Sequence, residues 1–195
     1  MIDFIIGDIV DMQEDYVVVQ NGGIGYKVST STTSMLEMNI GDKNVMMYTK
    51  LHVRDDAMVL YGFITKEEIE MFNLLLKVAS IGPKTALNIL STISPSQIKM
   101  AIHTKDYDTL SKAPGIGKKT AQRMVLELKD KVGELDEKDI IEGKMPTKDH
   151  DEAVDALMSL GYLKFEAEKA IREFDCETMK VEDIIKEALK VLSRN

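Results

Sequence analysis

Residues 75–86 (LLKVASIGPKTA) and residues 110–121 (LSKAPGIGKKTA) repeat each other and decide the fold of the middle of this chain. Aligned at an offset of 35 residues, the two stretches share a leucine, a lysine, an Ile-Gly pair and a Lys-Thr-Ala triplet. Each copy places a glycine-containing turn between two segments whose apolar residues follow helical spacing. We therefore predict two consecutive pairs of helices, each pair joined by a tight turn.

The chemistry of these turns favours binding of phosphate. Glycine permits a left-handed backbone and close approach of a ligand, and the isoleucine can fill the gap between the two helices. The first amides of the following helix have no intrahelical partner, and the helix dipole favours an anion there. Backbone amides recognise phosphate rather than bases, so binding would be independent of nucleotide sequence. The predicted DNA-binding residues are Ser80, Ile81, Gly82, Pro83, Lys84, Thr85, Gly115, Ile116, Gly117, Lys118, Lys119, Thr120 and Arg123.

Two simpler interpretations of the turns compete with this one. A single Gly-x-Gly-Lys stretch is more often a plain connection between helices, but its repetition favours a phosphate site on a nucleic-acid strand. The second copy also resembles part of a nucleotide-binding P-loop. That motif needs glycine at position 112 and serine or threonine at position 119, where this chain has Lys112 and Lys119. The sequence therefore gives no support for an ATPase.

The distribution of charge agrees with an anion-binding middle segment. The net charge of −8 looks unsuited to a nucleic-acid binder, but it is uneven along the chain. Residues 65–133 carry eleven basic and seven acidic side chains, a net of +4, whereas residues 1–64 carry four and nine, a net of −5. Residues 134–150 and 151–195 have net charges of −3 and −4. Such a separation favours a local anion-binding surface, although +4 over 69 residues could arise by chance.

Residues 1–64 have the pattern of short strands separated by turns. Ile2, Phe4 and Ile6 alternate with their neighbours, which predicts a half-buried strand, and an Asn-Gly pair marks a turn after the second strand. Residues 32–38 fit either a short helix or an irregular connection. About five strands in so short a segment predict a small barrel of the OB or SH3-like type. The strand-like stretches are residues 2–6, 16–19, 25–29, 45–49 and 58–63.

Helical signals begin at Thr65. Residues 65–68 (TKEE) and 94–97 (SPSQ) have the spacing of capping boxes, and the second has proline at the first helical position. Short helices are expected to continue to about Val132. After the first capping box the apolar residues at helical spacing are Ile69, Phe72, Leu76 and Ala79.

The end of the chain divides into a linker and a helical module. Residues 134–150 are mostly charged, with little apolar periodicity, which predicts a flexible acidic linker or, less simply, a frayed helix. Residues 149–152 (DHDE) resemble a capping box, and Gly161 would end the helix that follows. Three amphipathic helices are expected within residues 151–195. Their apolar positions are Ala153, Leu157, Leu160, Ala167, Ala170, Ile171, Phe174, Val181, Ile184, Ile185, Ala188, Leu189 and Leu192.

Composition excludes several other classes of protein. The 195 residues contain one cysteine, Cys176, and three widely spaced histidines, His52, His103 and His150, so neither a disulfide scaffold nor a Cys/His zinc site is supported. No window has the length and apolar character of a transmembrane helix, and the first residues lack the pattern of a secretory signal. We expect a cytoplasmic protein with no metal and no cofactor.

Tandem turns of this kind resemble helix-hairpin-helix motifs, which bind DNA without sequence specificity. Together with the N-terminal barrel, the acidic linker and the C-terminal helices, they make the whole chain similar to the RuvA family, the Holliday-junction-binding subunit of the bacterial branch-migration complex. A third matching piece is residues 53–57 (VRDDA) followed by 60–63 (LYGF). The fold expected from this resemblance is a multidomain α+β arrangement: an OB-fold barrel (1–64), a tandem helix-hairpin-helix domain (65–133), a flexible acidic linker (134–150) and a three-helix module (151–195).

The resemblance also implies a function for Asp55 and Asp56. From the sequence alone they are ordinary residues of a hairpin tip. In the family they would form an acidic pin at the centre of a tetramer, where carboxylates repel phosphates and hold a four-way junction open.

The same resemblance implies partners and a role in recombination and DNA repair. The protein would form a homotetramer, or an octamer of two tetramers, and residues 151–195 would contact the hexameric ATPase RuvB and stimulate it. The resolvase RuvC is a further expected partner. The protein itself would have no catalytic residue, because the ATPase site lies on the partner. For Leu160, Phe174, Ile185 and Leu189, packing within the helical module is the simpler alternative to a contact with the motor.

Three features keep rival hypotheses open. Ser80 stands where the family usually has glycine, so the first turn would be strained if residue 80 needs a positive φ. Asp106 and Asp108, which follow His103, could be the metal pair of a nuclease or mark a glycosylase, although they fit the polar start of a short helix better. An adaptor whose hairpins only pack helices is the third hypothesis, and it predicts no salt-dependent binding to DNA.

Overall fold

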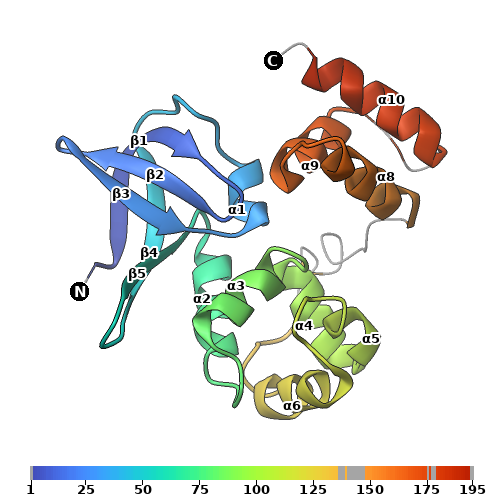
Figure 1. Cartoon of the computed structure of the whole chain (residues 1–195). Helices are drawn as coiled ribbons and strands as arrows, with labels where there is room; N and C mark the ends of the chain where they lie inside the picture. Colours follow the sequence, from blue (N-terminus) through green and yellow to red (C-terminus); the bar gives the residue numbers. More distant parts are fainter. Residues whose placement is uncertain (1, 136–138, 140–147, 175, 177–178, 194–195) are drawn as a thin grey trace. The chain divides into compact units, whose positions relative to one another are not determined.

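The computed structural model describes residues 2–135, 139, 148–174, 176 and 179–193. The chain folds into two compact units, residues 1–144 and residues 145–195 (Figure 1). No helix among the described residues has the length and apolar surface needed to cross a bilayer.

The N-terminal part is a closed five-stranded barrel. Its strands are β1 (Phe4–Met12), β2 (Tyr16–Asn21), β3 (Ile24–Ser29), β4 (Val45–Val53) and β5 (Met58–Phe63). They follow the order β1-β2-β3-β5-β4, with β3 and β5 parallel and the other pairs antiparallel. This arrangement confirms the predicted OB-fold. A short helix, α1 (Thr32–Leu36), connects β3 to β4 and is capped by Ser31, whose hydroxyl accepts the N–H of Ser34.

The buried face of β1 is the opposite of the one that the alternation predicts. Ile5 and Ile9 lie in the barrel interior, whereas Phe4 and Ile6 are 51% and 40% exposed. The prediction was wrong because Phe4, Ile5 and Ile6 are all apolar, so either phase of a period-2 pattern fits this run. Gly7 lies on the inner side, where a Cβ would come within 2.3 Å of the carbonyl oxygen of Gln20 on β2.

Five helices follow the barrel: α2 (Lys66–Leu75), α3 (Pro83–Leu90), α4 (Pro95–Thr104), α5 (Tyr107–Leu110) and α6 (Lys118–Leu128). Thr65 and Ser94 are the N-caps of α2 and α4, as predicted. Of these two helices, α4 has the reciprocal capping box. At α2 the carboxylate of Glu68 turns toward α1 instead, and α2 ends at Leu75, so Ala79 lies in the following turn.

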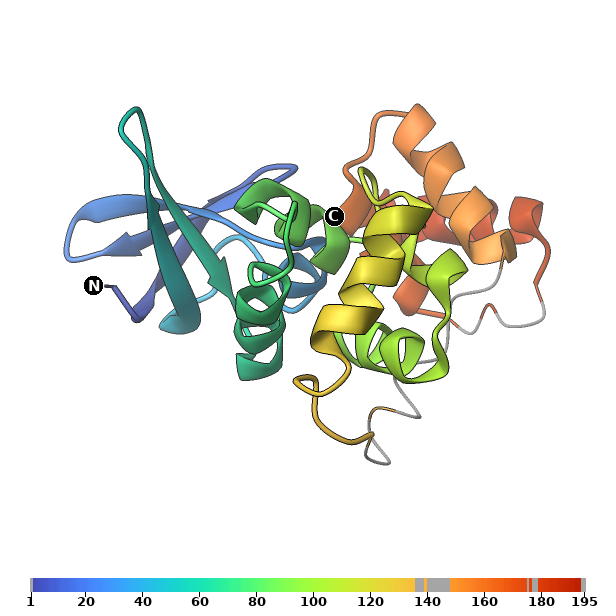
Figure 2. The same ribbon diagram turned by 90° about the horizontal axis from the view of Figure 1, so that it is seen from below.

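Strand β5 of the barrel contributes to the hydrophobic core of these helices. Tyr61 and Phe63 of β5 pack against Phe72 of α2, with ring centroids 5.2 and 5.1 Å apart, in the range of favourable aromatic pairs. The same core continues through α3, α4 and α6. Figure 2 shows the helices gathered at one end of the barrel, with the β4–β5 hairpin extending away at the other side.

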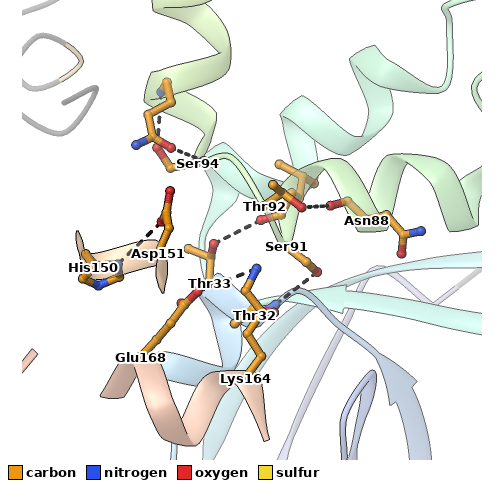
Figure 3. A network of polar contacts seen from close by, with 12 residues as sticks. Thr32, Thr33, Asn88, Ser91, Thr92, Ser94, His150, Asp151, Lys164 and Glu168 are labelled. Atoms are coloured by element: carbon orange, nitrogen blue, oxygen red, sulfur yellow. Dashed lines mark hydrogen bonds and ion pairs between the residues drawn. The ribbon is translucent and has the colours of Figure 1, made fainter. Parts of the chain in front are cut away.

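Polar contacts also connect the helices α1, α2 and α3 where they meet. Glu68 is 2% exposed and accepts hydrogen bonds from the hydroxyls of Ser31 and Ser34. Burial raises the pKa of the Glu68 carboxyl, and the hydrogen bonds from the serines partly oppose that rise. On the other side of α1, the N–H of Thr32 donates to Ser91 Oγ at 3.2 Å and Thr33 Oγ1 donates to the Leu90 carbonyl at 3.1 Å (Figure 3).

The second unit is a bundle of three helices, α8 (Lys148–Ser159), α9 (Lys164–Arg172) and α10 (Val181–Leu192). Its buried residues are alanines and branched aliphatics contributed by all three helices. Phe174, Ile185 and Leu189 are partly buried against this core, as the packing alternative expects, and Gly161 has the left-handed φ of +100° that follows a helix end. Leu160, which the pattern places on the core face, is 62% exposed.

The predicted linker needs two corrections at its described positions. Helix α8 begins at Lys148, so residues 148–150 belong to the bundle, and Asp149 lies in the first turn of the helix rather than at its cap. Asp139 is 4% exposed, and its carboxylate lies 3.0 Å from Lys99 Nζ on α4. Most of the segment predicted as flexible, residues 136–138 and 140–147, lies outside the described residues.

Candidate nucleic-acid interface

The two repeated stretches form two turns with matching backbone geometry. The first turn joins α2 to α3 and the second joins α5 to α6. Ser80 and Gly115, which align in the repeat, have φ angles of +78° and +87°. Both values lie in the left-handed region that favours glycine. The repeat in sequence is therefore a repeat in conformation, and residue 80 does need a positive φ.

An isoleucine anchors each turn. Ile81 donates its N–H to the carbonyl of Val78 at 3.1 Å, and Ile116 donates to the carbonyl of Ala113 at 3.0 Å. Both isoleucines are 5% exposed and belong to the core shared with the barrel. The predicted role of this residue, filling the gap between the helices, is confirmed in both copies.

Each turn leads into a helix whose first amides lack a side-chain cap. Gly82 is the N-cap of α3 and Gly117 the N-cap of α6, with extended φ angles of −90° and −88°. A Cβ built on either glycine would meet no heavy atom within 4 Å. Uncapped amides, the positive end of the helix dipole and open space are together the properties of an anion site.

Cationic side chains surround these helix ends. Lys84, Lys118 and Lys119 are exposed in the first turns of α3 and α6. Pro83 is the first residue of α3 and is buried, while Thr85 and Thr120 are half-buried. The three lysines make the surface of the two turns positive, and no side chain caps the helix amides beside them.

Arg123 has a different environment from the lysines. Its Nη1 donates to the carbonyl of Ala79 at 3.4 Å, and its Nε lies 3.8 Å from Glu127 Oε1. Glu127 Oε2 in turn accepts the N–H of Ala79 at 3.3 Å. Helix α6 therefore contacts the turn of the first hairpin. Sequence reasoning missed Glu127, because its partner lies 48 residues away in the chain.

Asp55 and Asp56 lie at the tip of the β4–β5 hairpin. Both are exposed, and the N–H of Arg54 donates to the carbonyl of Ala57 at 2.8 Å to close the turn. Arg54 Nε lies 2.9 Å from Nε2 of His52, at the base of the same tip. The hairpin projects from the barrel in both views, so the two carboxylates stand at the end of an extension (Figures 1 and 2).

Asp106, one of the two candidate metal residues of the nuclease hypothesis, and the nearby His103 are engaged in structural contacts. Asp106 is the N-cap of α5 and accepts both the N–H and the hydroxyl of Thr109, at 3.0 and 2.6 Å. These two hydrogen bonds lower the pKa of the Asp106 carboxyl. His103 Nε2 lies 2.7 Å from the carbonyl of Gly133. The interpretation of Asp106 and Asp108 as the polar start of a short helix is confirmed, and no three His, Cys, Asp or Glu residues of the described chain are grouped for a metal.

Known proteins resemble this chain over its whole length. Family profiles match in three consecutive stretches: "RuvA N terminal domain" over residues 1–62, "SAM-like Helix-hairpin-helix tandem" over 72–130 and "RuvA, C-terminal domain" over 148–193. Curated proteins named "Holliday junction branch migration complex subunit RuvA" are 46% identical in Clostridium botulinum and 44% identical in Alkaliphilus oremlandii. In each case the alignment covers 100% of both chains.

Proposed function

Because this chain belongs to the RuvA family, we propose that it binds four-way Holliday junction DNA and supports branch migration in recombination and repair. It would recognise the shape of the junction, not its sequence, and serve as the scaffold on which a separate motor acts. The junction would be held by the two hairpin turns and opened by the Asp55–Asp56 tip. The chromosomal substrate would place the protein in the cytoplasm.

The pair of matching turns is the single observation that carries this proposal. Each offers uncapped helix amides, open space in front of a glycine N-cap and at least one exposed lysine, and residues of both turns belong to one hydrophobic core. Two phosphates bound in fixed relation would define the path of a DNA strand rather than a single point of attachment. The phosphate-binding residues would be those predicted from the repeat, with Lys84, Lys118 and Lys119 supplying most of the charge.

The tip of the β4–β5 hairpin suits a role opposite to binding. Two exposed carboxylates repel phosphate, and on a projecting hairpin they would act at a distance from the barrel. In a tetramer with four-fold symmetry, four such tips would meet near the axis where the strands cross. Their repulsion would keep the crossover open and help to separate strands.

The outer surface of the barrel supports assembly into a tetramer. A closed barrel has no free strand edge, so subunits would meet through side chains rather than by adding strands. Phe4, Ile6 and Met46 form an apolar patch on neighbouring strands β1 and β4, since Ile6 lies opposite Met46. Apolar surface of this kind on a DNA-binding protein marks a protein–protein contact. The exposed large hydrophobics on the barrel are Ile2, Phe4, Ile6, Val10, Ile24, Met46, Val53 and Met58.

The three-helix bundle would recruit the motor. Its core is small, yet Met158 in the last turn of α8 and Leu160, which follows the helix, are 39% and 62% exposed. We assign to this bundle the contact with the RuvB ATPase, which would supply the ATP-driven work. The chain itself would act without catalysis, because Asp106 caps helix α5 and Asp108 lies in its first turn.

A titration of DNA binding tests the proposal. A synthetic four-way junction and a linear duplex of equal length would be compared at two salt concentrations. Tight junction binding that weakens with salt, with the duplex far behind, is the expected result. Equal affinity for both DNAs would remove the acidic tip and the four-fold assembly from the proposal. An absence of binding at low salt would instead support an adaptor, and magnesium-dependent cleavage of the junction would support a nuclease.

A further inference from the structure

We propose that Glu127 is a positioning residue for the first hairpin: with Arg123, it holds Ala79 so that Ser80 can keep the left-handed backbone that the phosphate site requires. The inference rests on the proposed function, because it concerns how one of the two DNA-binding turns is shaped. It also explains why a negatively charged side chain lies close to a turn that would bind phosphate, where charge repulsion alone would be unfavourable.

The contacts come from one side of helix α6. Glu127 Oε2 accepts the N–H of Ala79 at 3.3 Å, and Arg123 Nη1 donates to the Ala79 carbonyl at 3.4 Å. The two side chains are one helical turn apart and face each other, with Arg123 Nε 3.8 Å from Glu127 Oε1. Both polar groups of the Ala79 backbone are thus bound by a second element, toward which the α2–α3 loop extends (Figure 1).

The first hairpin needs this support because of the residue that follows. Ser80 has a φ of +78°, where an L-residue with a Cβ is strained. Strained residues persist when the surrounding structure fixes their neighbours. Fixing Ala79 on one side and the buried Ile81 on the other leaves Ser80 little freedom to relax out of the left-handed region.

The second hairpin is an internal control that lacks both the strain and the support. Its residue equivalent to Ser80 is Gly115, for which a φ of +87° is unstrained. Its residue equivalent to Ala79 is Pro114, which has no N–H to be accepted. The position equivalent to Glu127 is Thr92, two residues beyond the end of α3, and its hydroxyl donates to the carbonyl of Asn88 in that helix. The carboxylate therefore occurs only in the copy whose turn has an amide to hold and a strained residue after it.

The experiment separates positioning from simple charge. Removing a carboxylate near bound DNA should tighten binding if charge is all that matters. Positioning predicts the reverse for Glu127→Ala: junction affinity should fall about tenfold, and the slope of log affinity against log salt should shrink by about 0.9, the value for one bound phosphate. Glu127→Gln keeps an oxygen that accepts the Ala79 N–H, so its affinity should stay close to that of the unmodified protein.

The decisive experiment asks whether a substitution at Ser80 restores the DNA binding that Glu127→Ala loses. In the double variant Ser80→Gly/Glu127→Ala the turn no longer needs support, so junction affinity should return to within about twofold of the original. Asp130→Asn is the matched control, because Asp130 is an exposed carboxylate two residues beyond the end of α6. The proposal is overturned if Glu127→Ala binds as tightly as the Asp130→Asn control, or if Ser80→Gly fails to restore binding.

Hydrogen exchange tests the same inference without DNA. The amides of Ala79 and Ile81 should exchange faster in Glu127→Ala than in the unmodified protein, and the amide of Ile116 in the second turn should be unchanged. Unchanged exchange at Ala79 would overturn the positioning role. A protein that fails to bind any junction, yet shows the faster exchange, would instead disprove the proposed function and leave the support of the turn standing.

Discussion

Ser80 and Gly115 hold the same left-handed backbone at equivalent positions of two turns, although only one of them is glycine. The conformation therefore belongs to the hairpin and is imposed on whichever residue occupies it. We expect Ser80→Gly to stabilise the protein by about 0.5–1 kcal/mol, because relief of strain outweighs the added freedom of the unfolded chain. Chemical denaturation would measure the free energy of unfolding, and Gly115→Ser should lower it by a similar amount. Equal stability of all three proteins would contradict the strain.

Gly82 and Gly117 can be substituted to test DNA binding without disturbing the fold, because the fold does not require glycine at either position. Neither has a positive φ, and an added Cβ would contact nothing within 4 Å. Alanine at either site should change the free energy of unfolding by less than about 1 kcal/mol, since lost chain entropy and a poorer cap oppose each other. Junction affinity should nevertheless fall, because the methyl group would occupy the space of a phosphate. Unaltered affinity would mean that DNA does not approach these helix ends.

Reversal of charge tests the lysines of both hairpins. Lys84→Glu, Lys118→Glu and Lys119→Glu should each weaken junction binding and reduce the salt slope by about 0.9 for each phosphate that is no longer bound. Their exposure means that thermal stability should hardly change. Lys131→Glu, beyond the end of α6, is a matched reversal outside the turns. A similar weakening in Lys131→Glu would indicate only a general effect of net charge.

Neutralising the hairpin tip should have the opposite effect. Asp55→Asn with Asp56→Asn removes two negative charges from an exposed position, so affinity for DNA should rise by about two- to fivefold at low salt. If the tip serves to open the crossover, preference for the junction over duplex should decline at the same time. Competition between the two DNAs would measure this, and a lower affinity for both would argue against repulsion.

The buried Glu68 predicts a dependence of stability on pH. Burial raises the pKa of its carboxyl above the ordinary value of 4.5, so the folded protein holds this proton more tightly than the unfolded chain. The contribution to stability is full below pH 4.5 and is lost as pH rises through the folded pKa. In thermal unfolding at several pH values, the melting temperature of Glu68→Gln should rise relative to that of the unmodified protein as pH increases. Glu70→Gln, at an exposed position of the same helix, should show no such trend.

The sequence predicted most features that depend on neighbouring residues, such as the helix caps and the two repeated turns. An offset of 35 residues was enough to foresee both turns, because each depends on a few neighbouring residues. The strain at Ser80 was expected from the family resemblance alone, on the condition that residue 80 has a positive φ, which it does. The inward face of β1 was missed, because a run of apolar residues fits both phases of a strand. Leu160 was assigned to a core face, although it follows the last turn of α8.

Contacts between distant parts of the chain gave no sequence signal. Glu127 binds Ala79 across 48 residues, and Glu68 binds Ser31 across 37. In the sequence Glu68 fits the last position of a capping box, and Glu127 fits a solvated residue on the polar face of a helix. Only the packing of α6 beside the first turn, and of α1 against α2, shows that each one accepts hydrogen bonds from another element.

The core that runs from Phe63 through Phe72 has a consequence for how this protein can be altered. A border drawn at residue 64 by function would cut through a continuous packing unit and separate Glu68 from its serine donors. The barrel should therefore not express well alone, and exchanging it between relatives would succeed only if α2 travels with it. For protein engineering and for evolution alike, the exchangeable piece is the barrel with its helices, while the terminal bundle is a separate piece with its own interior.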